Sequence, residues 1–138
     1  MDDVRERIYE VVGTLKSSRS RDAAAAILEA VLEIATAENG RVLISFRAEP
    51  RSQWSFGPED AGAPRRVAKG EQLGTTPILI DASVDAERFE GALGKVTSVQ
   101  QLAYQSGMRI TGSSDFIVAA SRAINRRCFP RSADRPPA

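Results

Sequence analysis

The sequence contains no histidine and only one cysteine, Cys128. Without histidine the chain lacks the commonest general base and metal ligand, and therefore a Ser-His-Asp triad or a haem held by histidine. One cysteine cannot form an intramolecular disulfide, and without histidine it cannot complete a structural zinc site. We therefore expect no metal, no cofactor and no catalytic residues, and a reducing, cytoplasmic location.

Long apolar runs are also missing. No stretch reaches the ~18 successive apolar residues of a transmembrane helix, so we expect no membrane partner. The chain begins Met1-Asp2-Asp3, whereas a signal peptide begins with basic residues. Its 138 residues, 42% hydrophobic and 27% charged, are typical of one globular domain. We predict a single domain over residues 1–128 and a disordered, proline-rich tail over residues 129–138.

Apolar periodicity predicts helices at both ends of the chain. In residues 3–16, Val4, Ile8 and Val11 recur on one face. Residues 22–38 form the second predicted helix, with Asp22 as its N-cap and Asn39-Gly40 as its stop. The same periodicity predicts the last helix over residues 114–127.

Two apolar segments, residues 41–48 and 77–82, are rich in strand-forming residues. Residues 53–56 are expected to return from the first strand as a hairpin, and residues 107–110 to form a short strand. Residues 57–76 contain several glycines and prolines, a composition that predicts a loop. A short helical turn is possible within it at residues 65–69. Residues 96–106 fit helix and strand equally well.

The order of these elements and two sequence stretches resemble a GAF domain over residues 3–110. The first stretch runs from Asp22 through Asn39-Gly40 to Ile44 as helix, turn and strand. The second is Pro77-Ile78-Leu79-Ile80-Asp81-Ala82, followed by Asp85-Ala86-Glu87-Arg88-Phe89. The chain departs from the family after Ile110, where two further strands are usual, and so resembles a shortened member.

This resemblance implies an α+β fold: an antiparallel central sheet with helices packed on one face and a ligand pocket on the other. It also implies that Ser98-Val99 lies in a strand facing the pocket. The function implied is a regulatory or sensory module that binds a small molecule or protein partner and dimerises through its terminal helices. Cys128 lies outside the pocket region of bilin-binding members, and the Asn-Lys-Phe-Asp cluster of cyclic-nucleotide binders is missing.

The candidate ligand-binding residues are two aromatic and three charged side chains. Trp54 and Phe56 either line a pocket or fill the core, since aromatic side chains bring large apolar area. Asp81 and Asp85 either form a polar rim or an acid–base pair, or Asp85 caps a helix and Arg88 forms a surface ion pair.

The candidate partner-binding residues lie in the first and last helices. Val4, Ile8 and Val11 either pack into the core or pair with a second copy in a twofold dimer. Arg126 and Arg127 belong to residues 118–138, which carry five arginines against one aspartate, a net charge of +4. The alternative function is therefore a small adaptor that binds nucleic acid or another anionic partner through this end.

Overall fold

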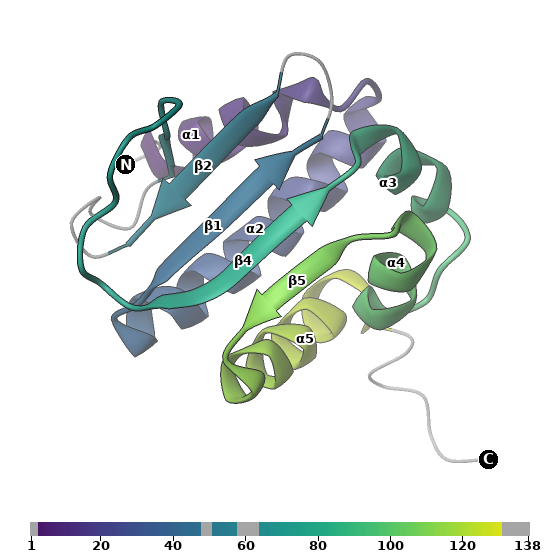
Figure 1. The fold of residues 1–138 in the computed structure, drawn as a ribbon. Helices are drawn as coiled ribbons and strands as arrows, with labels where there is room; N and C mark the ends of the chain where they lie inside the picture. Colours follow the sequence, from purple (N-terminus) through teal and green to yellow (C-terminus); the bar gives the residue numbers. More distant parts are fainter. Residues whose placement is uncertain (1–2, 48–50, 58–63, 131–138) are drawn as a thin grey trace.

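The computed structural model describes residues 3–47, 51–57 and 64–130, and within these ranges the side chains from Glu6 onward. A five-stranded sheet carries a layer of helices on one face (Figure 1). None of the helices described is long and apolar enough to cross a membrane. The helical elements are α1 (Asp3–Val11), η1 (Val12–Thr14), α2 (Ser18–Glu38), α3 (Ala86–Leu93), α4 (Val99–Ser106) and α5 (Ser114–Cys128). The strands are β1 (Arg41–Phe46), β2 (Ser52–Phe56), β3 (Arg65–Arg66), β4 (Ile78–Val84) and β5 (Arg109–Gly112).

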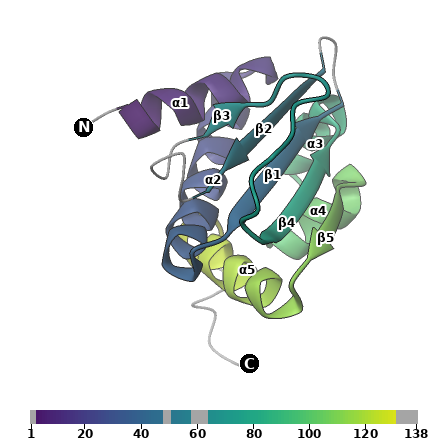
Figure 2. The same cartoon turned by 60° about the vertical axis from the view of Figure 1, so that its left-hand side comes forward.

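The sheet is mixed, with strand order β3-β2-β1-β4-β5. Strands β1 and β4 pair in parallel, and the other three pairs are antiparallel. The α+β class is thus confirmed, but the expectation of an antiparallel sheet was wrong. After β3 the chain crosses the helix-free face of the sheet, so β4 starts at the same end as β1 (Figure 2). That crossover provides the long connection that parallel neighbours require.

Side-chain alternation gives the sheet one apolar face. Val42, Ile44 and Phe46 on β1 point toward the helices, as do their β4 partners Ile80, Ala82 and Val84. Because successive side chains of a strand point to opposite faces, Leu43 and Asp81 lie on the helix-free side.

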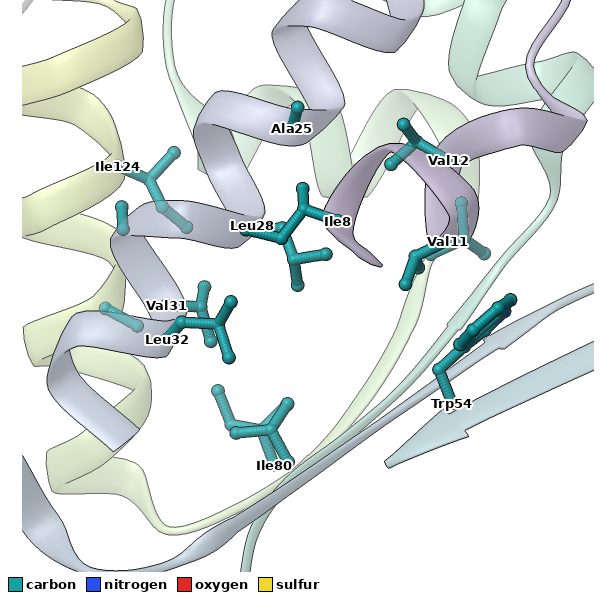
Figure 3. Close-up of a cluster of buried hydrophobic side chains, with 14 of the residues drawn as sticks. Ile8, Val11, Val12, Ala25, Leu28, Val31, Leu32, Trp54, Ile80 and Ile124 are labelled. Carbon is teal, nitrogen blue, oxygen red and sulfur yellow. The ribbon is translucent and has the colours of Figure 1, made fainter. Parts of the chain in front are cut away.

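Helix α1 packs into the core along the predicted apolar stripe. Ile8 and Val11 are buried, as is Val12 just beyond them. Figure 3 shows these side chains between Leu28 of α2 and Trp54 of β2.

Helix α2 begins earlier than expected, because Ser17 is its N-cap in place of Asp22. The Ser17 hydroxyl accepts a hydrogen bond from the Ser20 amide. One carboxylate oxygen of Glu90, on α3, accepts from the amides of Lys16 and Ser17 at 2.7 and 2.9 Å and from the Ser20 hydroxyl at 2.7 Å. Glu90 thereby satisfies amides at the start of α2, which have no partner within the helix.

The remaining differences concern short elements. Residues 65–66 form strand β3 where we expected a helical turn, because they pair with Trp54 and Ser55. The ambiguous segment contains helix α4, whose N-cap Ser98 accepts from the Gln101 amide. Val99 therefore begins a helix and does not lie in a strand. Asn39 ends α2 in the left-handed conformation, at φ 56°, where the sequence predicts the stop.

We predict that Glu90→Gln destabilises the fold at neutral pH and that the effect fades in acid. Hydrogen bonds from Ser17, Ser20 and Lys16 lower the pKa of Glu90 below its usual range. A carboxylate whose pKa is lower in the folded than in the unfolded protein stabilises the fold at any pH above its unfolded pKa. This stabilisation is lost as the pH falls through the pKa of the folded protein. Because Glu90 is partly exposed, we expect a loss of only about 1 kcal/mol at pH 7.

Urea unfolding of both proteins at pH 7, and then at successively lower pH, measures this difference. Glu87→Gln is the control, since Glu87 is exposed on the same helix. Equal effects of the two substitutions, or a Glu90→Gln effect that grows in acid, would contradict the assignment.

Candidate functional site: an apolar cavity between the sheet and the helices

A cavity of about 140 Å³ lies between the helix layer and the sheet, lined by 21 residues. Among the lining residues that the structure describes, Ser121 alone has a polar side chain. The sheet wall consists of the helix-facing residues of the parallel pair, Val42, Ile44, Phe46, Ile80, Ala82 and Val84. Met108 and Ile110 extend this wall to the edge strand.

Every helix of the layer except α1 contributes to the opposite wall. Leu28 and Val31 come from α2, Phe89 from α3, Leu102 from α4 and Ile124 from α5. All five are buried. The cavity is therefore part of the main core of the protein and is not a surface groove.

Small side chains create the empty space. Ala24, Ala82 and Ala120 line the cavity on α2, β4 and α5. Ile44 and Ala82 lie near the centre of the sheet on its helix-covered face, yet both are only half-buried, because the cavity lies over them. Protein interiors are usually packed as densely as organic crystals, so an unfilled space here is a local exception.

The cavity approaches the surface at the edge strand β5. Ile110 is opposite Ala82 in the β4–β5 ladder and so points toward the helices. It is nevertheless 38% exposed, and no other cavity-lining residue is exposed to that degree. Met108, Ile117 and Ser121 line the cavity and are half-buried. We therefore place the entrance along β5.

The ionisable side chains that the structure describes lie outside the cavity lining. Arg127, in the last turn of α5, pairs with Glu33 at 2.8 Å and with Glu29 at 3.7 Å, and these carboxylates raise its pKa. Partial burial raises the pKa of the neighbouring Cys128 thiol, so this cysteine is predominantly protonated at neutral pH. Burial thus outweighs the neighbouring Arg127 cation, which by itself would lower the pKa of the thiol, and the cysteine is not activated.

Trp54 and Phe56 are buried on the helix-covered face of β2, but neither lines the cavity. Figure 3 shows Trp54 beside Val11. Both aromatic side chains belong to the hydrophobic core of the protein.

The three charged candidates lie outside the cavity as well. Asp81 is exposed on the helix-free face of the sheet. Asp85 is the N-cap of α3 and accepts a hydrogen bond from the Arg88 amide at 3.1 Å. The Arg88 side chain is exposed and lies against Gly107. The structure thus does not bring Asp81 and Asp85 together with the aromatic pair in one pocket.

The candidate partner-binding residues divide between the core and the surface. Ile8 and Val11 are 2% and 1% exposed, so their apolar surface is already covered within the chain. The Val4 side chain lies outside the described residues. Arg126 is exposed, whereas Arg127 is paired with acidic residues of α2. Arg131 and Arg135, which belong to the predicted tail, lie beyond the described residues.

Sequence reasoning missed the residues that form the cavity. The available signal was the alternation of Val42, Ile44 and Phe46, which marks one buried face of a strand. Nothing in that alternation shows that the space opposite Ala82 stays open. In the part of the chain that the structure describes, no three His, Cys, Asp or Glu side chains gather as metal ligands do.

Comparison with known proteins gives only distant structural likenesses. No protein-family profile matches the chain, and no curated protein matches it. Sterol carrier protein 2 like 2 from Aedes aegypti aligns at a TM-score of 0.46 and 15% identity, covering 86% of this chain and 90% of that chain. Sterol carrier protein 2 like-3 from the same organism aligns at 0.48 and 13%, covering 91% and 96%. The apo form of sterol carrier protein 2 from Yarrowia lipolytica aligns at 0.44 and 12%, covering 99% and 97%. Likenesses this distant do not assign a function.

The resemblance to GAF domains was wrong. The sheet has a parallel pair at its centre, whereas the resemblance implied an antiparallel sheet. The cavity lies between the sheet and the helices, whereas the resemblance implied a pocket on the other face. Both matching stretches describe local order, helix–turn–strand and strand–cap–helix, which does not specify how distant strands pair.

We predict that Ala82→Val stabilises the protein by about 1 kcal/mol, because it adds apolar atoms to empty space and favours a strand. Urea unfolding measures the change. Ser83→Val is the matched control: it also favours a strand, but Ser83 is on the opposite face, and we expect a change within about 0.5 kcal/mol. Destabilisation by Ala82→Val beyond that of Ser83→Val would show that the space is already filled.

Proposed function

We propose that this protein binds a small apolar molecule in the cavity between its sheet and its helices. The observation that carries the proposal is the cavity lining, in which 20 of 21 residues have apolar side chains. An apolar cavity of this kind stays dry, so a ligand displaces no hydrogen-bonded water on entering. Ligand binding would thus replace empty space with dispersion contacts.

The energetic cost of the empty cavity supports a ligand-binding role. At 24 cal/mol per Å³, a residual cavity of about 140 Å³ costs about 3 kcal/mol of stability. Leucine or valine in place of the alanines at 24, 82 and 120 would reduce this cost. A ligand that occupies the space recovers part of the lost contact energy, and so couples binding to stability.

The volume indicates the size of ligand that fits without rearrangement. An engineered apolar cavity of about 150 Å³ holds benzene or xenon. A longer hydrocarbon would have to extend past Ile110 toward the entrance or displace the half-buried side chains Met108 and Ile117.

The proposed role is binding without a chemical step. The lining residues supply no carboxylate, thiol, amine or imidazole, and general acid–base catalysis depends on such groups. Dimerisation through α1 is not part of this proposal, because Ile8 and Val11 are buried within the chain.

We predict that benzene and n-hexane bind in the cavity. Titration of the methyl-labelled protein should give saturable NMR shifts at Ile44 and Leu102, which line the cavity, and a rise in melting temperature. Ala82→Leu fills the centre of the cavity and should weaken binding roughly tenfold or more, since each 1.4 kcal/mol of lost contact energy is a factor of ten.

Ala119→Leu is the matched control, because Ala119 is exposed on α5 and does not line the cavity. It should bind both probes as the unmodified protein does. Absence of saturable shifts at the cavity methyl groups, or equal binding to Ala82→Leu, would refute the proposal.

A further inference from the structure

Ser121 provides the single polar side chain among the described residues that line the cavity. It lies on α5 between Ile117 and Ile124, which line the same wall. Its side chain is half-buried, as are Ile117 and Met108 near the entrance. A serine on this wall borders an otherwise apolar space, where a hydrogen-bonding ligand atom meets little competition from other polar groups.

The Ser121 hydroxyl makes no hydrogen bond to any residue that the structure describes. Serine and threonine within helices often bond back to a carbonyl of the preceding turn. Here Thr36 bonds to the Leu32 carbonyl at 2.9 Å and Ser106 to the Leu102 carbonyl at 2.7 Å. Ser121 therefore retains its full capacity to donate one hydrogen bond and accept two.

We propose that Ser121 determines specificity in this cavity by binding the one uncharged polar group of an otherwise hydrocarbon ligand. This inference rests on the proposed function. The ligand class is a hydrocarbon that carries a single hydroxyl or carbonyl group. Ser121 bonds that group at the α5 wall, and the hydrocarbon part contacts the aliphatic lining.

The same lining selects against other ligands. A second polar group inside the cavity would lose its water without gaining a partner, because the remaining 20 lining side chains are apolar. An ionised group would lose more hydration free energy on entering, since no described lining side chain is charged. A pure hydrocarbon would bind, but would leave the Ser121 hydroxyl without a partner.

The test compares n-hexane with 1-hexanol, which differ by one hydroxyl. Dissociation constants are measured by methyl NMR titration for the unmodified protein and for Ser121→Ala. We expect Ser121→Ala to weaken 1-hexanol about 3- to 10-fold, the worth of one net hydrogen bond. Binding of n-hexane should be unchanged or slightly tighter.

Two further variants separate hydrogen bonding from packing. Ser121→Thr keeps the hydroxyl and should retain the preference for 1-hexanol over n-hexane. Ser114→Ala removes an exposed hydroxyl on the same helix, outside the cavity lining, and should change neither affinity.

The outcomes distinguish this inference from the proposed function. If both probes bind and Ser121→Ala changes neither affinity, or weakens both equally, the role of Ser121 is overturned and the apolar binding site stands. If neither probe binds the unmodified protein, the proposed function fails, and the assignment of Ser121 fails with it.

Discussion

The parallel pairing of β1 with β4 positions the rest of the structure. Hydrogen bonds from the Arg41 amide to the Pro77 carbonyl and from the Arg47 amide to the Val84 carbonyl, both 2.8 Å, close the two ends of the pair. The register sets Val42, Ile44 and Phe46 beside Ile80, Ala82 and Val84. Two alternating strands thus give one continuous apolar face, which the helices must cover to exclude water.

Contacts at the periphery of the helix layer explain how a cavity persists beneath it. Glu90 joins α3 to the start of α2, and Arg127 joins the end of α5 to Glu33 of α2. Asn125 of α5 accepts a hydrogen bond from the Val99 amide of α4 at 2.7 Å. These contacts tie the four helices to one another outside the cavity. A cavity destabilises a protein less where its walls can collapse into the empty space. The contacts between the helices oppose such a collapse and so preserve the space above Ala82 and Ile44.

The selectivity of the proposed binding site depends on the polar groups that its walls lack as well as on the apolar side chains that they contain. An aliphatic lining provides affinity in proportion to the apolar area it buries, but little discrimination among hydrocarbons of similar size. We propose that the hydroxyl of Ser121 adds discrimination, because a ligand must place a hydrogen-bonding group opposite this one point of the wall. The charged and aromatic residues that stand out in the sequence have other roles: Asp85 caps a helix, and Trp54 packs beside α1.

The sequence by itself determined the local elements. The apolar stripe of α1, the stop at Asn39 and the strand-forming stretches at Val42 and Ile80 are where their patterns predict them, because periodicity and capping depend on near neighbours. Strand direction and the cavity were decided only in the tertiary structure. The crossover between β3 and β4 fixes the parallel pair, and no local pattern encodes it. Empty space over Ala82 arises where elements from distant parts of the sequence meet, since a small side chain leaves a cavity only if its distant neighbours do not fill it.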